Sequence, residues 1–306
     1  MAILIDPPLW PAHGTIFSHL VSDQSLTQLH AFAQAQGLPE RAFDRDHYDV
    51  PQKRYETLIA AGAQPVSATE LVRRLVRSGL RVPARERPER LDAVLRARWN
   101  ALLPNTQDLG EDLLARWSQG HRKYHDRAHL LAVLTGLDAL TGTTEKSPEH
   151  RGIYLAAWFH DAVYQGLASD ERESASLARE LLTDAGLATE LSAEVARLVE
   201  LTIKHDPAPD DLPGQLLCDA DLEVLARAPG AYKRYAAAVR EEYAHVSDAA
   251  FAAGRSTILR ELLATTWLYS TTRARELWES AARENITREL SELAMLITPH
   301  PGSNNT

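Results

Sequence analysis

The chain has 306 residues, of which 44% are hydrophobic and 25% are charged, and its net charge is −9. This composition is typical of a globular protein, and the length is sufficient for two domains. No apolar run reaches the roughly 20 residues that a membrane-spanning helix needs, and no basic run suggests a nucleic-acid surface. The first residues lack the regions of a secretory signal, so we expect a cytoplasmic protein without a membrane partner.

Cys218 is the only cysteine, which excludes an internal disulfide and a zinc site of the CxxC type. Any metal ion must therefore be held by histidines and carboxylates. Such ligands suit Mn, Mg, Fe, Ni, Co or a catalytic Zn ion. The chain has 12 histidines, and several of them lie in tight groups.

The sequence predicts a small α/β domain over residues 1–83. Its strand-like runs, AILID and RAFDRDHYDV, alternate with helical periodicity in SLTQLHAFAQAQG and ATELVRRLVRSGL. The following segment, RVPARERPERL, is charged and contains two prolines, so we place a linker at 84–92.

Helical periodicity dominates the rest of the chain, from LDAVLRARWNALL to RARELWESAARENITRELSELAML. We expect an all-α domain over 93–298, with RGIYLAAWFHDAVY and SAEVARLVELTIKH as helices, and a disordered tail at 299–306. The predicted fold class is therefore mainly α, with a small α/β domain in front. Gly254 interrupts a helical pattern, which indicates a packing or functional reason.

Histidines and aspartates recur along the helical domain. A pair four residues apart is expected on one helix face, an adjacent His-Asp pair ends an apolar run, a further histidine ends a helix, and two aspartates are expected at a helix start. Taken singly, each has an ordinary interpretation as a hydrogen-bonded core residue or a helix cap. In chain order they are His125 and His129, His160 and Asp161, His205, and Asp219 and Asp221.

This order, in YHDRAHLLAVL, AAWFHDAVYQ and LLCDADLEVLA, resembles the HD superfamily of metal-dependent phosphohydrolases over roughly 90–296. The resemblance implies one or two divalent metal ions, with His129, His160, Asp161 and Asp221 as ligands. His129 is favoured over His125 because apolar residues follow it at the spacing usual in HD helices. Asp221 is favoured over Asp219 because the second aspartate of such a pair usually binds the metal. His125 and Asp219 remain alternatives, as an additional ligand or as pocket residues.

A bound divalent ion lowers the pKa of a coordinated water towards about 7 and polarises a phosphoryl oxygen. Catalytic roles are expected for Asp161, for Glu171 as a general base or further ligand, and for His205 as a ligand of a second metal or of phosphate. Glu171 is equally well interpreted as an acid in the first turn of a helix. Phosphate-binding candidates are Arg122, Lys204, Lys233, Arg240 and Arg255.

The amino-terminal segment resembles a small bacterial domain family of unknown function over roughly 1–83, through its IDPP, HG, SHL and FDRDHYD elements. This resemblance implies no activity. The segment could form a second metal or nucleotide site, or its polar residues could serve as caps and turns. The candidate residues are His13, His19, Asp44, His47 and Asp49.

We therefore expect a phosphohydrolase that acts on a small phosphorylated molecule, such as a nucleotide phosphomonoester, with a homodimer left open. One alternative is a regulatory module that binds a nucleotide without turnover. Another is an oxygenase that uses a di-iron version of the HD pocket.

Overall fold

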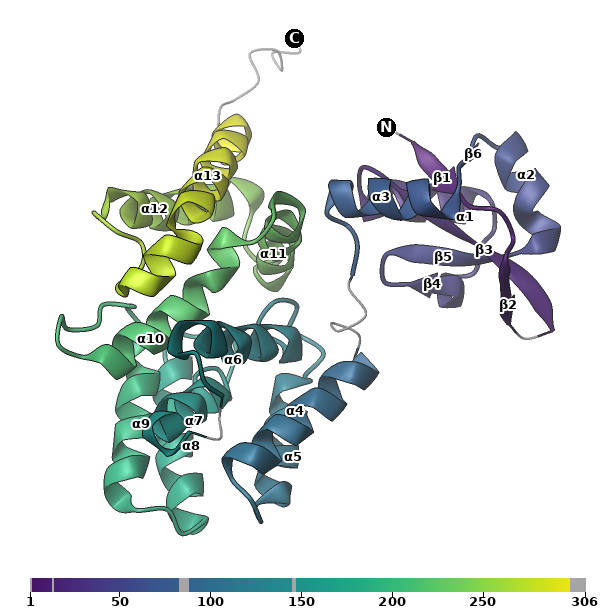
Figure 1. Cartoon of the computed structure of the whole chain (residues 1–306). Coiled ribbons are helices and arrows are strands. Elements are labelled where there is room, and N and C mark those ends of the chain that lie inside the picture. Colours follow the sequence, from purple (N-terminus) through teal and green to yellow (C-terminus); the bar gives the residue numbers. More distant parts are fainter. Residues whose placement is uncertain (1, 13, 83–87, 145–146, 298–306) are drawn as a thin grey trace. The chain divides into compact units, whose positions relative to one another are not determined.

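The computed structural model describes residues 2–12, 14–82, 88–144 and 147–297, and the chain divides into two compact units. One unit comprises Met1–Ala84 with Ala228–Arg234, and the other comprises Arg85–Arg227 with Tyr235–Thr306. The first is a small α/β unit and the second is helical (Figure 1), which confirms the predicted fold class. None of the described helices is long and apolar enough to cross a membrane.

Two of the predicted segments, the tail and the linker, lie wholly or partly outside the described residues. The expected tail, 299–306, lies outside them, as do residues 84–87 of the expected linker. The rest of that linker is wrong, because helix α4 (Pro88–Leu102) already begins at Pro88. Proline is well accommodated in the first turn of a helix, where its missing N–H has no partner to lose.

A mixed sheet forms the centre of the amino-terminal unit, with the strand order β4-β5-β3-β1-β6 and β2 paired to β3. Among the strands that the structure describes, only the β1–β6 pair is parallel. The run RAFDRDHYDV, predicted as one strand, forms two strands that are joined by a turn in which Arg45 has a φ of 61°. The strands are β1 (Ile3–Ile5), β2 (Trp10–Ala12), β3 (Thr15–Ser22), β4 (Phe43–Asp44), β5 (His47–Pro51) and β6 (Gln64–Pro65).

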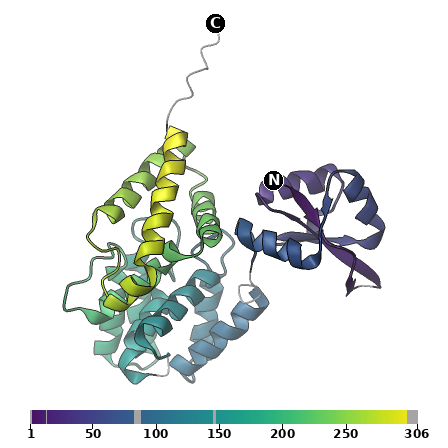
Figure 2. The same ribbon diagram turned by 45° about the horizontal axis from the view of Figure 1, so that its top comes forward.

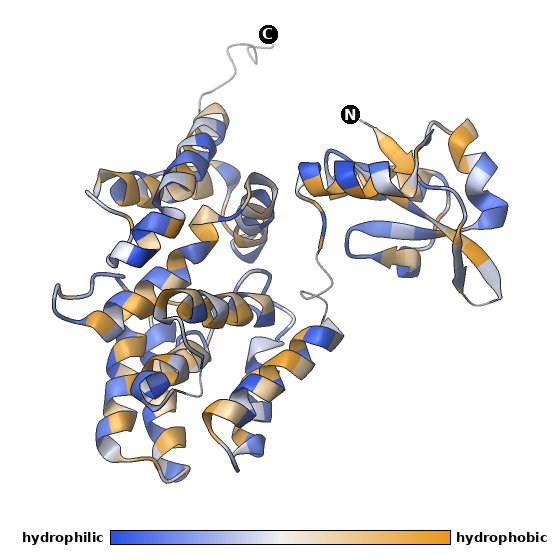
Figure 3. Ribbon diagram, in the orientation of Figure 1, coloured by the Kyte–Doolittle hydropathy of each residue, from blue (hydrophilic) through white to orange (hydrophobic). Residues whose placement is uncertain are grey.

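Three helices cover this sheet: α1 (Leu26–Ala35), α2 (Tyr55–Ala60) and α3 (Ala68–Ser78). Successive residues of a strand point to opposite faces, so neighbours in β3 enter different cores. Leu20 packs with Leu29 of α1 and Leu58 of α2, whereas Val21 packs with Leu71 of α3. The apolar residues of β1 contribute side chains to both cores (Figure 3).

Local signals explain where α3 begins and ends. Ser67 accepts a hydrogen bond from the N–H of Glu70, which satisfies one of the free donors of the first turn. At the other end, Gly79 adopts a φ of 75°, a left-handed conformation that favours glycine and stops the helix.

The helical unit buries a continuous apolar core. Every residue from Ile153 to Phe159 is buried, as expected for a helix surrounded by others. Trp99 packs edge-on against Trp158, with ring centroids 5.0 Å apart. The indole of Trp117 donates to the carbonyl of Trp158.

Helix α6 packs against α7 and α10, α8 against α9, and α12 against the long α13 (Figures 1 and 2). The remaining helices are α5 (Gln107–Trp117), α6 (Arg127–Thr141), α7 (Arg151–Phe159), α8 (Asp170–Asp184), α9 (Thr189–Leu201), α10 (Leu212–Asp221), α11 (Pro229–Glu242), α12 (Asp248–Ala264) and α13 (Thr272–Ile297).

Candidate metal centre

Three helix ends of the helical unit bring His129, His160, Asp161 and Asp221 together. His129 lies in the first turn of α6, where the Asp126 side chain caps the helix by accepting from the N–H of His129. Asp221 is the last residue of α10. Helix α7 ends at Phe159, so the prediction that it continues through His160 and Asp161 is wrong. Because this pair follows the helix, the two side chains are free to point towards one centre.

The ligand atoms of these four residues lie close together. Nε2 of His129 is 3.1 Å from Nε2 of His160 and 3.1 Å from Oδ1 of Asp221. Nε2 of His160 is 3.2 Å from Oδ2 of Asp161 and 3.6 Å from Oδ1 of Asp221. Atoms bound at about 2.0–2.2 Å to one ion lie about 3–3.5 Å apart, so these separations suit a shared cation.

The hydrogen bonds of this group also favour a cation. Nδ1 of His160 lies 2.9 Å from the carbonyl of Ala157, which can only accept, so His160 carries a proton on Nδ1. A neutral His160 therefore presents a lone pair on Nε2 to the carboxylates and to His129. Acceptors this close repel one another unless a proton or a cation lies between them. The group could hold a metal ion.

The electrostatic field of the site favours positive charge. Burial opposes charge on His160, but Asp161 and Asp221 outweigh it and raise its pKa to about 9. Burial also acts against charge on Asp221, yet His160, His129 and His205 hold the pKa of that carboxyl well below its usual range. For His129, burial dominates and lowers the pKa. A site that binds a proton this firmly attracts a cation by the same charges.

His205 extends this group on the side of Asp221. Its Nε2 lies 2.7 Å from Oδ2 of Asp221, the oxygen that does not face His129. Helix α9 ends at Leu201, so the prediction that it reaches His205 is wrong. His205 instead follows a turn and adopts a left-handed φ of 51°. The side chain is about a quarter exposed, at 26%.

Asp219 has a different environment from Asp221. Its carboxylate accepts the backbone N–H groups of Ser270 and Thr271 and the hydroxyl of Thr271, just before α13. The prediction that both aspartates lie at a helix start is wrong, because they occupy the last turn of α10. A carboxylate is disfavoured there by the helix dipole, so each is held by contacts outside its own helix.

His125 does not share a helix face with His129, because α6 begins only at Arg127. It lies in the preceding loop, where its ring centroid is 5.8 Å from that of His129. Nδ1 of His125 is 2.7 Å from Oε2 of Glu242. His125 therefore borders the metal group.

Arg122 is buried and binds the backbone around the site. Its guanidinium donates to the carbonyls of His125, Asp161 and Ala162 at 3.0, 2.8 and 3.3 Å. These bonds connect the loop before α6 to the segment after α7. Arg122 thereby holds Asp161 in place.

The other residues predicted as catalytic or phosphate-binding differ in their exposure and partners. Glu171 is half-buried in the first turn of α8. Arg240 binds Asp248, and Arg255 pairs with Glu289. Lys204 and Lys233 are exposed, Lys204 next to His205 and Lys233 on α11.

In the amino-terminal unit, His19, His47 and Asp49 form a second group that could hold a metal ion. Burial opposes charge on His47, but Asp46 and Asp49 raise its pKa to about 9. Asp44 lies on β4 outside this group, and His13 lies outside the described residues.

Sequence reasoning missed Glu242 entirely. Its carboxylate is buried and accepts from the backbone N–H groups of Lys123, Tyr124 and His125 and from the hydroxyl of Tyr164. Glu242 ends α11, 117 to 119 residues along the chain from the backbone groups that it binds and 78 from Tyr164. Nothing in the local pattern REEYAH distinguishes it from a surface acid.

The chain thus has a helical unit with a buried His/Asp group, and an α/β unit with a second group. Residues 3–78 match a family described as a protein of unknown function, DUF4031. This match agrees with the predicted small domain of unknown function. No curated protein and no solved structure matches the chain at a significant level.

Proposed function

We propose that the helical unit is a metal-dependent phosphohydrolase of the HD superfamily that hydrolyses a phosphomonoester of a nucleotide or a related small metabolite. The observation that supports this proposal is the convergence of His129, His160, Asp161 and Asp221 within 3.1–3.7 Å at the ends of three helices. The chain order of these residues is that of the HD signature.

A divalent cation bound here would supply a Lewis acid for the phosphoryl group and would lower the pKa of a bound water. The chain's own residues orient the site. Ala157 fixes the ring of His160, and Arg122 fixes the backbone of Asp161. His205 orients Asp221, and because it is partly exposed, we assign it the exchange of a proton with substrate or solvent.

Phosphate binding requires a cation that reaches the substrate. Arg122 and Arg255 are engaged by carbonyls and by Glu289, respectively. Lys204 has an exposed side chain and precedes His205, so we propose it as the phosphate-binding residue. We leave Glu171 out of the proposed machinery because no described contact connects it to the four ligands.

The test is metal analysis of the purified chain, followed by assays of phosphate release from p-nitrophenyl phosphate and a nucleotide panel with Mn, Co, Ni or Mg. We expect Asp161→Ala and Asp221→Asn to lower activity at least 100-fold and to reduce metal content. The matched control is His245→Ala, which removes an exposed histidine that stacks on Tyr243. Circular dichroism of each variant separates loss of the site from loss of the fold.

Two results would overturn the proposal. Nucleotide binding without phosphate release under every metal would make the unit a regulatory module. Tightly bound iron with oxygen consumption, again without phosphate release, would make it an oxygenase.

A further inference from the structure

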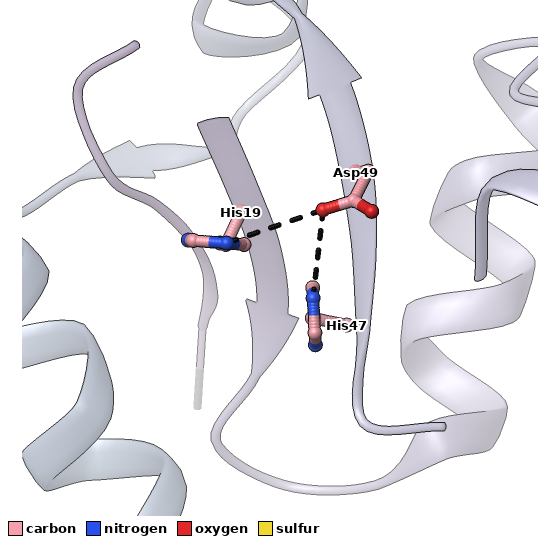
Figure 4. A group of neighbouring side chains, drawn as sticks. All are labelled: His19, His47 and Asp49. Atoms are coloured by element: carbon pink, nitrogen blue, oxygen red, sulfur yellow. Dashed lines mark ion pairs between the residues drawn. The ribbon is translucent and has the colours of Figure 1, made fainter. Parts of the chain in front are cut away.

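The second His/Asp group follows from the register of the amino-terminal sheet. His19 of β3 lies directly opposite Asp49 of β5, and His47 precedes Asp49 by two residues. Because side chains alternate along a strand, all three lie on one face of the sheet (Figure 4). This is the face that packs on α3 through Val21.

The three side chains turn nitrogen and oxygen atoms towards one another. Oδ1 of Asp49 is 3.5 Å from Nε2 of His47 and 4.0 Å from Nε2 of His19 (Figure 4). The imidazole rings meet edge-on, with centroids 4.9 Å apart. Ligands of one transition-metal ion lie about 3–3.5 Å apart. The 3.5 Å contact of His47 meets this spacing, whereas the 4.0 Å contact of His19 would have to shorten on metal binding.

Each histidine is oriented by its own buried carboxylate. Asp6 is 1% exposed, and its Oδ2 lies 2.9 Å from Nδ1 of His19. Asp46, also 1% exposed, has Oδ1 2.5 Å from Nδ1 of His47. A carboxylate that accepts from Nδ1 leaves the Nε2 lone pair directed outward, towards Asp49. This carboxylate–histidine pairing is the arrangement that orients metal-binding histidines in proteins.

The two carboxylates are themselves fixed. Asp6 also accepts from the backbone N–H of His19 and from the indole of Trp10. Asp46 also accepts from the backbone N–H of Val82. Both carboxylates are buried, so each histidine ring is held in one orientation from the protein side, with its Nε2 edge left for Asp49.

We propose that His19, His47 and Asp49 bind a divalent transition-metal ion in the amino-terminal unit. Two imidazoles favour ions such as Zn, Co, Ni or Fe over Ca or Mg, which prefer oxygen ligands. Three protein ligands leave at least one coordination position open, as in sites that bind a substrate or an exogenous ligand.

Asp49 also helps to line a cavity of about 830 Å³. Trp10 and Phe17 supply aromatic surface, and Trp10 also packs on the ring of His19 with centroids 5.1 Å apart. Arg41, Lys53 and Arg54 supply positive charge to the same wall. We infer that the site takes a small anion with an apolar or aromatic portion, whose charged group coordinates the ion.

The test uses the full chain in a His160→Ala background, so that ions in the helical unit do not mask the result. Cobalt binding is followed by its visible absorption, and zinc content by elemental analysis. We expect one equivalent in this background, its loss in His47→Ala, and 10- to 100-fold weaker binding in Asp46→Asn. The matched control is His30→Gln, a histidine of the same unit that contacts Tyr48 and not the group.

Equal metal content in the background protein and its His47→Ala variant would overturn the site. Because the readout is metal content in a protein without His160, this result is independent of whether the helical unit releases phosphate.

The ligand is tested by adding phenyl phosphate, benzoate or inorganic phosphate to the cobalt-loaded protein. We expect phenyl phosphate to change the absorption at lower concentration than inorganic phosphate, and Lys53→Gln to weaken the effect about tenfold. Arg73→Gln is the control, because Arg73 is an exposed cation of α3 that pairs with Glu70. No spectral change up to millimolar anion would overturn the inferred ligand class.

Discussion

Glu242 at the end of α11 and His125 in the loop before α6 form a buried pair, with Oε2 2.7 Å from Nδ1. The other oxygen of Glu242 accepts three successive backbone N–H groups, at 2.7, 2.8 and 3.1 Å. One carboxylate thus fixes the loop that leads into the helix of His129. The stability of this wall of the site depends on a single ionised group.

We therefore predict that the stability of the fold decreases at acidic pH and that Glu242→Gln removes this dependence. Burial acts against the charge of Glu242, but the bond to His125 and the backbone donors lower its pKa to about 2. Since the folded pKa is below the ordinary value of about 4.5, the unfolded chain binds more protons between these values. The ionised carboxylate of Glu242 makes its full contribution above about pH 4.5, and this contribution, about 3 kcal/mol, is lost as the pH falls towards 2.

Urea unfolding between pH 6 and pH 3 measures this effect. The free energy of unfolding should fall more for the wild type than for Glu242→Gln over this range. The variant should already be less stable than the wild type at pH 6. Glu241→Gln is the control, since Glu241 is an exposed neighbour that pairs only with Lys123 at 3.1 Å among the described residues. Parallel curves for wild type and Glu242→Gln would contradict the prediction.

The two aspartates of the CDAD motif should separate stability from metal binding. Asp219 accepts two backbone N–H groups and a hydroxyl, and the two bonds from Thr271 are buried. Asp219→Asn replaces one of the accepting carboxylate oxygens with an amide NH₂ group, which faces these donors without a hydrogen bond. We expect the free energy of unfolding to fall by about 2 kcal/mol. Asp221→Asn should instead leave the metal-free protein nearly as stable and remove the bound ion. Unfolding curves and metal content of both variants decide this, and equal metal loss in the two would contradict it.

Arg122→Lys should weaken the site through its backbone. An ammonium group cannot reach three carbonyls in the fork geometry of a guanidinium, so the carbonyls of Asp161 and Ala162 lose donors. We expect the free energy of unfolding to fall by about 2–3 kcal/mol and metal affinity to fall with it. Arg116→Lys, an exposed pair with Asp112, should change neither. Retention of wild-type metal affinity in Arg122→Lys would show that Asp161 holds its place without Arg122.

The resemblance to the HD signature selected His129, His160, Asp161 and Asp221, four residues that the structure brings together. Their local structure was less predictable. The apolar run before His160 continues a helical pattern, yet α7 stops at Phe159 because the next residues turn into a centre built by other helices. Periodicity reports on apolar burial, and polar residues that meet at a site follow different constraints.

The long-range partners of the site histidines could not be predicted from the sequence pattern for the same reason. Glu242, Asp6 and Asp46 orient histidines, but each looks like an ordinary acid near a strand or helix end. His19, His47 and Asp49 share a sheet face by register, and register follows from pairing between residues that lie 28 to 34 positions apart in the chain. Without that pairing, the caps-and-turns interpretation of the segment could not be separated from a site.

The last prediction concerns two helical glycines, for which substitution by alanine is expected to have opposite effects on stability. Gly110 of α5 is buried, and an added Cβ would overlap the indole of Trp99. That indole cannot easily move, since it donates to the carbonyl of Thr106 and packs on Trp158. Gly110→Ala should therefore destabilise the fold by about 1–3 kcal/mol.

Gly254 was expected to have a packing or functional reason, and the structure shows no packing reason among the described residues. It is exposed within α12, and an added Cβ would meet no atom within 4 Å. Glycine inside a helix is less favourable than alanine by about 0.5–1 kcal/mol, so Gly254→Ala should stabilise the protein by that amount. Thermal unfolding of both variants checks the pair. A lower melting temperature for Gly254→Ala would mean that α12 needs the glycine for a contact with another molecule.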